Sequence, residues 1–322
     1  MTERGWQIGY TGGTFDRASE RRLDDAFLAA EVAAGRFRVA PVWRDRNLVF
    51  SPPGGGPRAA FLSGEAARGL LQGGGETGSP GILLGVEGGE LAFAVDVSTF
   101  DPEVAAFGAG DYADIRSLAG LLPAAEAALL ATARGVCHWQ RTHRFCGACG
   151  SPTASREAGH ARLCLNEACG RIHYPRLDPA VIMLVESVGE DGVPRCLLAH
   201  NARFPNAVYS TLAGFVEIGE TLEQAVRREV WEEVGLAVGE VVYRASQPWP
   251  FPSSIMLGFS AMAEAAVPTP DRVEVTDARW FSAADLAAAA EWGEEEAEIR
   301  LPRRDSIARF LVEAWRARFA AD

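Results

Sequence analysis

Three glutamates at helical spacing are the residues of this chain that most clearly indicate chemistry. Glu229, Glu232 and Glu233 stand at positions i, i+3 and i+4 of a predicted helix, so their side chains share one face. Like charges on one face repel, and a divalent cation would relieve that repulsion. Oxygen ligands of this kind suit Mg²⁺ or Mn²⁺, which can neutralise a diphosphate and lower the pKa of a water molecule. Taken alone, such a cluster is equally consistent with a solvated acidic helix face.

The residues around the glutamates predict where this helix begins and ends. Thr221 is the expected N-cap, and Gln224 three residues later completes a capping box. Gly235 is the expected C-cap. Gly214 and Gly219 give the preceding loop the freedom to bend back on the helix. The sequence therefore predicts a short loop and a helix that together present the acidic face.

The whole stretch 214–236, GFVEIGETLEQAVRREVWEEVGL, resembles the box of Nudix hydrolases without any departure from its pattern. The resemblance implies that Glu229 and Glu233 bind a metal, that Glu232 helps to activate water, and that Arg228 orients the glutamates. The implied catalytic residues are Glu229, Glu232, Glu233, Arg228 and Glu220.

A stiff aromatic loop follows the box in the sequence SQPWPFPSS, residues 246–254. Its three prolines fix φ and remove backbone N–H groups, which holds Trp249 and Phe251 at defined positions. Aromatic side chains held in this way are suited to gripping a flat nucleobase. The alternative is a packed proline–aromatic connection that binds no ligand.

Four cysteines precede the box in two pairs, Cys146 with Cys149 and Cys164 with Cys169. Two such knuckles can supply a closed tetrahedral Zn²⁺ site, which would be structural because no coordination position stays open. The alternatives are buried or surface thiols, with a disulfide least favoured. The second pair has four intervening residues where many zinc ribbons have two. The remaining two cysteines, Cys137 and Cys196, are expected in the core.

The combination of cysteine module, box and SQPWPFP loop resembles the NADH pyrophosphatase family of Nudix hydrolases. YPRLDPAVI at 174–182 is also similar, and the resemblance is close over 141–312 but weaker before residue 120. Family members split NADH or NAD⁺ into AMP and the nicotinamide mononucleotide, and related members remove NAD caps from RNA 5′ ends. The resemblance implies Mg²⁺ or Mn²⁺ at the catalytic site, one structural Zn²⁺ per chain and a homodimer.

Site residues follow from the same resemblance by position. The implied Mg²⁺ or Mn²⁺ ligands are Glu229, Glu233, Glu274 and the backbone carbonyl of Ala213. The implied substrate contacts are Arg116, Tyr174, Phe215, Gln247, Pro248, Trp249, Pro250, Phe251, Pro252, Ser253, Ser254, Glu274 and Ala308. The match at Arg116 requires a small gap, and Glu274 lies outside any motif.

The amino-acid composition of the chain limits the partners that it can bind. The formal net charge of −12 gives no general attraction to a phosphate polymer, so any contact with NAD-capped RNA should be local. Arginines around the cysteine module offer one modest basic face for such a contact: Arg141, Arg144, Arg156, Arg162 and Arg171. The N-terminus shows no secretory signal and no stretch is apolar enough to span a membrane, which predicts a cytoplasmic protein.

The chain of 322 residues divides into three expected parts. These are an N-terminal α/β domain at 1–135, a zinc ribbon at 141–175 and a Nudix domain at 176–322, which we expect to be an α/β/α sandwich in an α+β protein. Glycine-rich stretches at 51–57 and 71–81 are expected loops. Expected strands are 48–50, 59–62, 81–86, 91–97, 179–187, 195–200, 208–215, 255–265 and 277–282, and expected helices begin at 123, 221 and 303.

Two other functions remain open from the sequence. The first is a broader Nudix diphosphatase that prefers ADP-ribose or dinucleoside polyphosphates. The second is a zinc-ribbon binding protein that carries an inactive Nudix scaffold, although the intact box at 214–236 counts against it.

Overall fold

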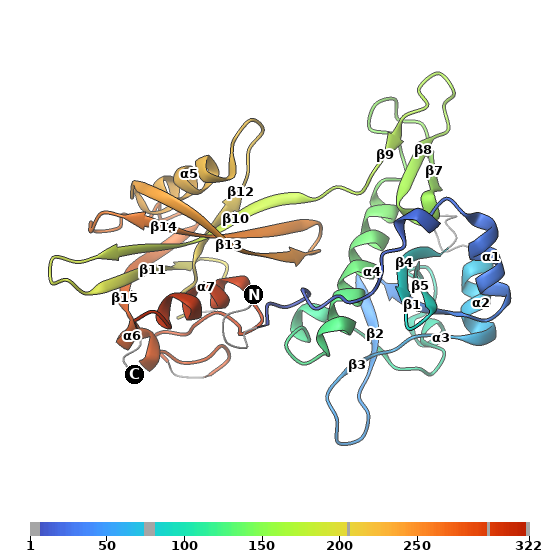
Figure 1. The fold of residues 1–322 in the computed structure, drawn as a ribbon, viewed down its shortest axis with the longest axis horizontal. Coiled ribbons are helices and arrows are strands. Elements are labelled where there is room, and N and C mark those ends of the chain that lie inside the picture. The colour runs from blue at the N-terminus through green and yellow to red at the C-terminus, as the bar shows by residue number, and fades with distance from the viewer. Residues whose placement is uncertain (1–6, 74–80, 205–206, 295–296, 320–322) are drawn as a thin grey trace. The chain divides into compact units, whose positions relative to one another are not determined.

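The computed structural model describes residues 7–73, 81–204, 207–294 and 297–319. The chain forms two compact units (Figure 1). The N-terminal unit comprises residues 10–177 and 249–253, and the C-terminal unit comprises residues 1–9, 178–248 and 254–322. The cysteine module thus groups with the N-terminal unit. No helix among the described residues has the length and apolar character needed to cross a membrane.

The N-terminal unit contains a mixed sheet in the order β3-β2-β1-β5-β4, with β6 paired to β2. Its central strands β1 and β5 are parallel, and the other pairs are antiparallel. The strands are β1 (Phe37–Trp43), β2 (Arg46–Phe50), β3 (Arg58–Ala59), β4 (Ile82–Glu87), β5 (Glu90–Asp96) and β6 (Asp111–Ala113).

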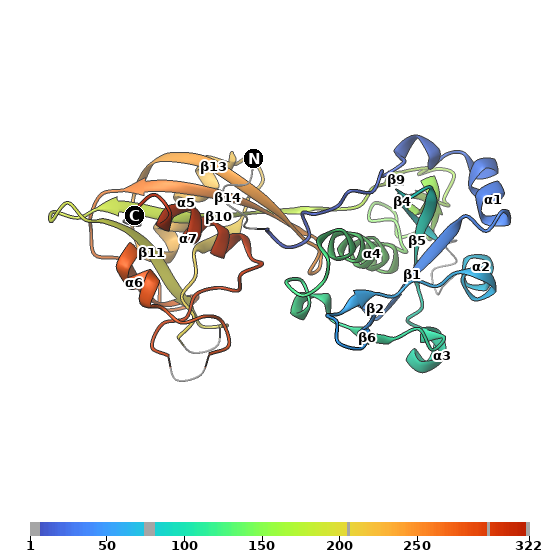
Figure 2. The same cartoon turned by 60° about the horizontal axis from the view of Figure 1, so that its bottom comes forward.

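Helices cover both faces of this sheet, because side chains alternate along the strands (Figure 2). Ala92 and Ala94 of β5 pack in one cluster with the long helix α4 (Ala124–Thr142). Phe93 and Val95 pack in the opposite cluster with the short helices. Those helices are α1 (Asp25–Ala33), α2 (Gly64–Gly73) and α3 (Pro102–Ala106). The expected N-terminal α/β domain is confirmed.

The cysteine module is a small three-stranded antiparallel sheet in the order β7-β8-β9. Its strands are β7 (Thr153–Arg156), β8 (Ala161–Cys164) and β9 (Ile172–His173). Cys146 and Cys149 lie in the loop before β7, Cys164 ends β8, and Cys169 lies in the loop between β8 and β9.

The C-terminal unit is built on a mixed sheet in the order β13-β14-β10-β11-β15, with β12 also paired to β10. Strand β10 runs parallel to β14 and antiparallel to β11 and β12. The strands are β10 (Asp178–Val188), β11 (Pro194–Asn201), β12 (Leu212–Phe215), β13 (Val238–Trp249), β14 (Ser254–Ala263) and β15 (Val275–Ser282).

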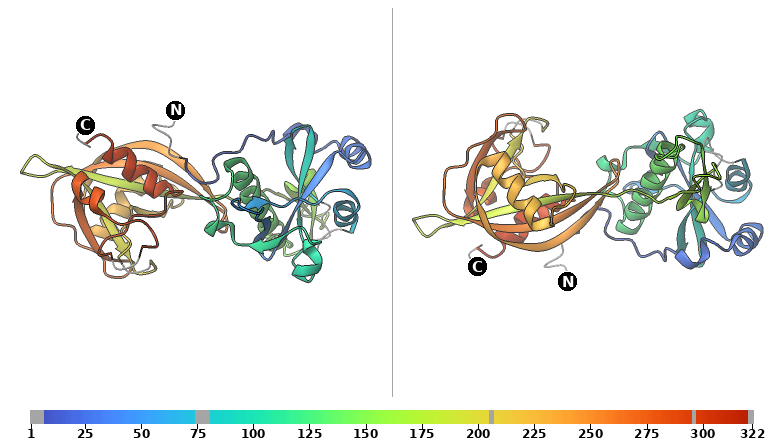
Figure 3. Two further views of the ribbon diagram at one scale, coloured as in Figure 1. Left: turned by 90° about the horizontal axis from the view of Figure 1, so that it is seen from below. Right: turned by 90° about the horizontal axis from the view of Figure 1, so that it is seen from above.

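This second sheet is also covered on both faces. Val181 and Met183 of β10 pack with helix α5 (Leu222–Val234), whereas Ile182 packs with α6 (Ala283–Ala288) and α7 (Ile307–Arg316). In Figure 3, α7, in red, lies in front of the sheet in one view, and α5, in orange-yellow, lies in front of it in the opposite view. The expected α/β/α sandwich is confirmed.

Four local expectations are wrong. The strand expected at 208–215 is confined to Leu212–Phe215, with isolated bridges at Val208 and Ser210. The loop expected at 246–254 begins inside β13, which ends at Trp249. Residues 71–73 were expected in a loop but end helix α2, because Leu70 and Leu71 pack against the core and this packing outweighs the cost of the glycines; the rest of that stretch, 74–80, lies outside the described residues. The strand expected at 59–62 ends at Ala59, and Leu62 makes only an isolated bridge to Val39.

Candidate active site

Helix α5 carries the acidic residues, and its ends are fixed as the sequence predicts. The Thr221 side chain accepts a hydrogen bond from the Gln224 N–H, and the Gln224 side chain accepts one from the Thr221 N–H. Gly235 ends the helix in the left-handed conformation, with φ 68°. Both ends of the helix are therefore fixed by local hydrogen bonds.

Arg228 is the centre of the charged network on this helix. Its guanidinium makes a bidentate pair with Glu220 at 2.7 and 2.9 Å, and it donates to Glu229 at 2.8 Å and Glu232 at 3.0 Å. It also donates to the backbone carbonyl of Phe215 at 2.8 Å. The bond from Arg228 lowers the pKa of Glu220 to about 2. The orienting role implied for Arg228 and Glu220 thus has a matching geometry.

Gly214 on β12 makes room for Glu229. A Cβ on residue 214 would lie 1.9 Å from the Cδ atom of Glu229, far inside contact distance. The Glu229 carboxylate therefore lies directly against the β12 backbone, next to residue Ala213. Burial raises the pKa of Glu229 even though Arg228 opposes the shift.

Glu233 is the most unusual acid of the helix. It is 6% exposed, and its Oε2 atom has no hydrogen-bond partner among the described residues. Burial, followed by the negative charges of Glu229 and Glu274, raises the pKa of Glu233 to about 8. A buried carboxylate with a free oxygen, beside further carboxylates, is an arrangement that a divalent cation would stabilise. The residues present fit a divalent cation.

Glu274 comes to this site on the loop before β15. The Asp271 N–H donates to the carbonyl of Glu233 at 3.0 Å, and the Thr269 N–H donates to that of Val234 at 2.7 Å. These bonds fasten the loop to the end of α5. The Asp271 carboxylate then accepts from the N–H groups of three successive residues, including Glu274. Asp271 is a residue that the sequence analysis missed, although an Asp at the start of a turn is a known local signal.

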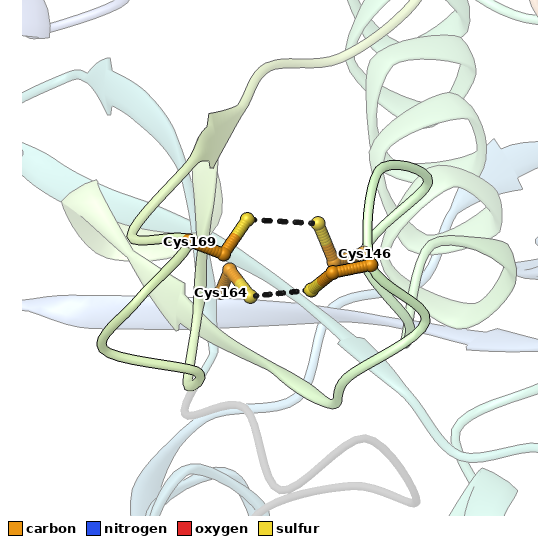
Figure 4. Close-up of side chains that lie close together, drawn as sticks. Cys146, Cys164 and Cys169 are labelled. Atoms are coloured by element: carbon orange, nitrogen blue, oxygen red, sulfur yellow. Dashed lines mark hydrogen bonds between the residues drawn. The ribbon is translucent and has the colours of Figure 1, made fainter.

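The four cysteines form a separate centre in the N-terminal unit. Cys146 Sγ lies 3.8 Å from Cys169 Sγ, and Cys149 Sγ lies 3.5 Å from Cys164 Sγ (Figure 4). All four sulfur atoms lie within 4.8 Å of one another, the only such group of potential ligands among the described residues. Four thiolates at this spacing fit a closed tetrahedral Zn²⁺ site.

The side chain of His173 lies just outside this centre, with its Nε2 3.3 Å from Cys146 Sγ. In contrast to the sulfur atoms, the glutamate oxygens do not gather within 4.8 Å. Arg228 draws Glu229 and Glu232 toward itself, and the carboxylates repel one another.

Three family models match successive parts of the chain. The NADH pyrophosphatase-like rudimentary NUDIX domain matches residues 37–139, the NADH pyrophosphatase zinc ribbon domain matches 141–174, and the NUDIX domain matches 176–301. A relative from Mycobacterium bovis, named NAD-capped RNA hydrolase NudC, is 38% identical over 250 residues, 73% of this chain and 75% of its own length. The chain belongs to the NADH pyrophosphatase family of Nudix hydrolases.

Other members of this Nudix family match a smaller share of their own length. The human NAD-capped RNA hydrolase NUDT12 is 44% identical over 59% of this chain, and the match spans 42% of the human protein. NudC from Stutzerimonas stutzeri is 47% identical over 59% of this chain and 62% of its own length. A solved Nudix hydrolase from Nitrosomonas europaea is 25% identical over 53% of this chain and 91% of its own, with a TM-score of 0.40.

The implied substrate residues of the Nudix chain lie in different surroundings. Gln247 is 1% exposed, and its amide is fully engaged, since it donates to the carbonyls of Gly9 and Asp305 and accepts from the N–H of Ile307. Ala308 is buried in α7, and Ser254 is buried at the start of β14. The Gln247 amide therefore links β13 to residues 9, 305 and 307 of the C-terminal unit, and the other two positions lie in the interior of that unit.

Trp249 and Phe251 lie in the N-terminal unit, where they are partly buried. Their ring centroids are 5.1 Å apart, and Tyr10 packs against both. Arg116 donates from Nε and Nη2 to one oxygen of Asp114, Oδ2, and its guanidinium carbon lies 5.6 Å from the Phe251 centroid. The remaining implied residues of the loop are Pro248 and Pro252, which are exposed, and Pro250 and Ser253, which are half-buried.

Tyr174 in the N-terminal unit and Phe215 in the C-terminal unit are both well exposed and free to meet a ligand. The basic face expected around the ribbon is smaller than predicted. Arg141 is held by Asp45 and Asp96, and Arg162 is buried against Thr153, so these two arginines are structural. Arg144, Arg156 and Arg171 remain exposed.

Proposed function

We propose that this protein hydrolyses the diphosphate of NADH or NAD⁺, giving AMP and the nicotinamide mononucleotide. The observation that carries the proposal is the buried carboxylate of Glu233, whose Oε2 has no hydrogen-bond partner among the described residues, beside the Arg228 network. It lies in a chain that a NUDIX domain model and two NADH pyrophosphatase models match between residues 37 and 301. Relatives named NAD-capped RNA hydrolases support the same cleavage at the NAD cap of an RNA 5′ end.

Residues of the Nudix box have different roles in the proposed reaction. Glu229, Glu233, Glu274 and the carbonyl of Ala213 would hold Mg²⁺ or Mn²⁺, which supplies charge neutralisation of the diphosphate and makes water a better nucleophile. The glutamate oxygens lie on the α5 face, against β12 and the 269–275 loop. Arg228 orients Glu229 and Glu232 by direct hydrogen bonds.

Glu232 is our candidate for the base. Its side chain is 56% exposed and has one oxygen on Arg228, which leaves the other able to accept a proton. Water attacks one phosphorus, its proton passes to the base, and the bond between that phosphorus and the bridging oxygen breaks. The leaving mononucleotide keeps the bridging oxygen as part of its phosphate.

The structural zinc belongs to the same proposal: one Zn²⁺ per chain, held by Cys146, Cys149, Cys164 and Cys169. Hydrogen bonds from Ser151 lower the pKa of the Cys149 thiol, which favours the thiolate that a metal requires. We also propose a cytoplasmic homodimer; light scattering of the purified protein tests the dimer directly.

A side-by-side assay tests the substrate. With Mg²⁺ or Mn²⁺ present, we expect NADH and NAD⁺ to be cleaved with higher kcat/KM than ADP-ribose or dinucleoside polyphosphates. A preference for ADP-ribose would instead identify a broader diphosphatase. No cleavage of any of them, with metal bound, would identify an inactive scaffold.

A further inference from the structure

The tip of the β13–β14 connection, residues 249–253, is held by the N-terminal unit. Trp249 and Phe251 pack on a core cluster of that unit, together with Tyr10. This tip is part of the stretch that the family resemblance assigns to the substrate. The residues that hold the tip in place therefore bear on substrate recognition.

Its prolines leave the tip short of backbone donors. Pro250 and Pro252 have no N–H group, and the Phe251 N–H is already bonded to the Trp249 carbonyl at 2.7 Å. The Pro250 carbonyl thus requires a donor from another element if it is to be satisfied.

Arg134 of helix α4 supplies that donor. It is 9% exposed, and its Nη1 donates to the Pro250 carbonyl while its Nε donates to the Asp45 carbonyl at 3.0 Å. Its guanidinium carbon lies 4.5 Å from the Phe251 ring centroid. Burial of a cation costs free energy. A buried arginine of α4 that donates to a loop far away in the sequence therefore indicates that it has a role in holding that loop.

The next residue of α4 adds an independent sign of close approach. A Cβ on Gly135 would lie 3.1 Å from the Pro250 Cβ, tighter than an ordinary contact. Glycine is unfavourable in the middle of a helix, and here it leaves space for the tip. Arg116 approaches the same ring, at 5.6 Å from the Phe251 centroid.

We propose that Arg134 is a positioning residue for substrate recognition, which fixes the 249–253 tip so that Trp249 and Phe251 face the substrate in one conformation. This inference rests on the proposed cleavage of NADH. The role of Arg134 is in the affinity for the dinucleotide, and it is separate from the metal chemistry.

The test is Arg134→Met, which keeps an apolar stem and removes the donors and the charge. We expect the KM for NADH to rise at least about tenfold while kcat changes less than about threefold, because the residue acts on binding. Arg134→Lys, which retains a charge and a donor, should recover part of the affinity. The matched control is Arg38→Met, since Arg38 also stacks on a ring, Phe61, and pairs with Glu87 in the same unit.

Gly135→Ala is the second variant, and it keeps the proposal testable if Arg134→Met does not fold. Alanine favours the helix, so stability should hold while crowding at Pro250 raises KM severalfold. Equal KM values for wild type, Gly135→Ala and Arg38→Met would overturn the proposal, as would a fall in kcat alone in Arg134→Met.

Equilibrium binding of NADH to the metal-free protein separates this inference from the proposed function. Weaker binding by Arg134→Met than by Arg38→Met supports the positioning role even if the wild type cleaves a different dinucleotide. Identical binding by these two variants contradicts it even if NADH is cleaved.

Discussion

The carboxylate of Glu229 lies in the space that a side chain on residue 214 would fill. A Cβ there would be 1.9 Å from Cδ and 2.0 and 2.2 Å from the two oxygens. Gly214→Ala should therefore displace the Glu229 carboxylate and weaken Mn²⁺ binding and turnover by about 10–100-fold, as expected when the support of a metal ligand is lost. Titration of Mn²⁺ by electron paramagnetic resonance measures the affinity.

Gly239→Ala is the matched control for this change. Gly239 also lies in a strand of the C-terminal unit, and a Cβ on this residue would have its nearest neighbour, the carbonyl of Met262, only at 4.0 Å. Unchanged Mn²⁺ affinity in Gly214→Ala would show that the glycine is not needed to seat Glu229.

Asp271 should matter for the metal although it lies outside the box. Its carboxylate accepts from the N–H groups of Val273, Glu274 and Val275, so Asp271→Ala should loosen the loop that carries Glu274. We expect Mn²⁺ affinity to fall about tenfold with the fold retained. Asp191→Ala is the control, since Asp191 accepts from the Val193 N–H in another turn; an equal effect of both variants would contradict the account.

We expect the four-cysteine centre to bind one equivalent of zinc per chain. Cys164→Ser should lose the zinc and lower the melting temperature by several degrees, because a closed Cys₄ site contributes folding energy. Elemental analysis and thermal unfolding measure the two effects. Cys196→Ala removes a buried thiol from β11 and should retain the zinc. Full zinc content in Cys164→Ser would contradict the assignment.

Stability against acid should depend in part on Glu291. Hydrogen bonds from Arg309 and Arg304 lower the pKa of Glu291 to about 2, from an ordinary value of 4.5. A lowered folded-state pKa stabilises the fold above the unfolded value, and this contribution is lost as the pH falls from about 4.5 to about 2. Glu291→Gln should therefore be less stable than wild type at pH 7, with the difference shrinking toward pH 2. A constant difference in urea unfolding across this range would be incompatible with the ion pairs.

Local signals in the sequence predicted much of the fold. The capping box of Thr221 and Gln224 and the C-cap at Gly235 are formed by neighbouring residues, and all three are confirmed. The apolar runs that became β10 and β11 are likewise recognisable without a partner. Such features depend on residues a few positions apart, and a single sequence contains them.

Long-range contacts set the features that sequence analysis missed. The amide of Gln247 is engaged by Gly9 and Ile307, which are far away along the chain, and Arg134 meets Pro250 across 116 positions. Neither pairing leaves a periodic or local pattern. The sequence therefore identified the acids of the site but not the residues that place its loops.

Release of AMP from NADH is the most direct test of the central claim. The wild type with Mg²⁺ or Mn²⁺ should give equal amounts of AMP and the reduced nicotinamide mononucleotide, and chelation of the metal should stop the reaction. Glu233→Gln should lower kcat by orders of magnitude while the chain remains folded. Metal-independent cleavage, or near-normal turnover by both Glu233→Gln and Glu229→Gln, would contradict the account.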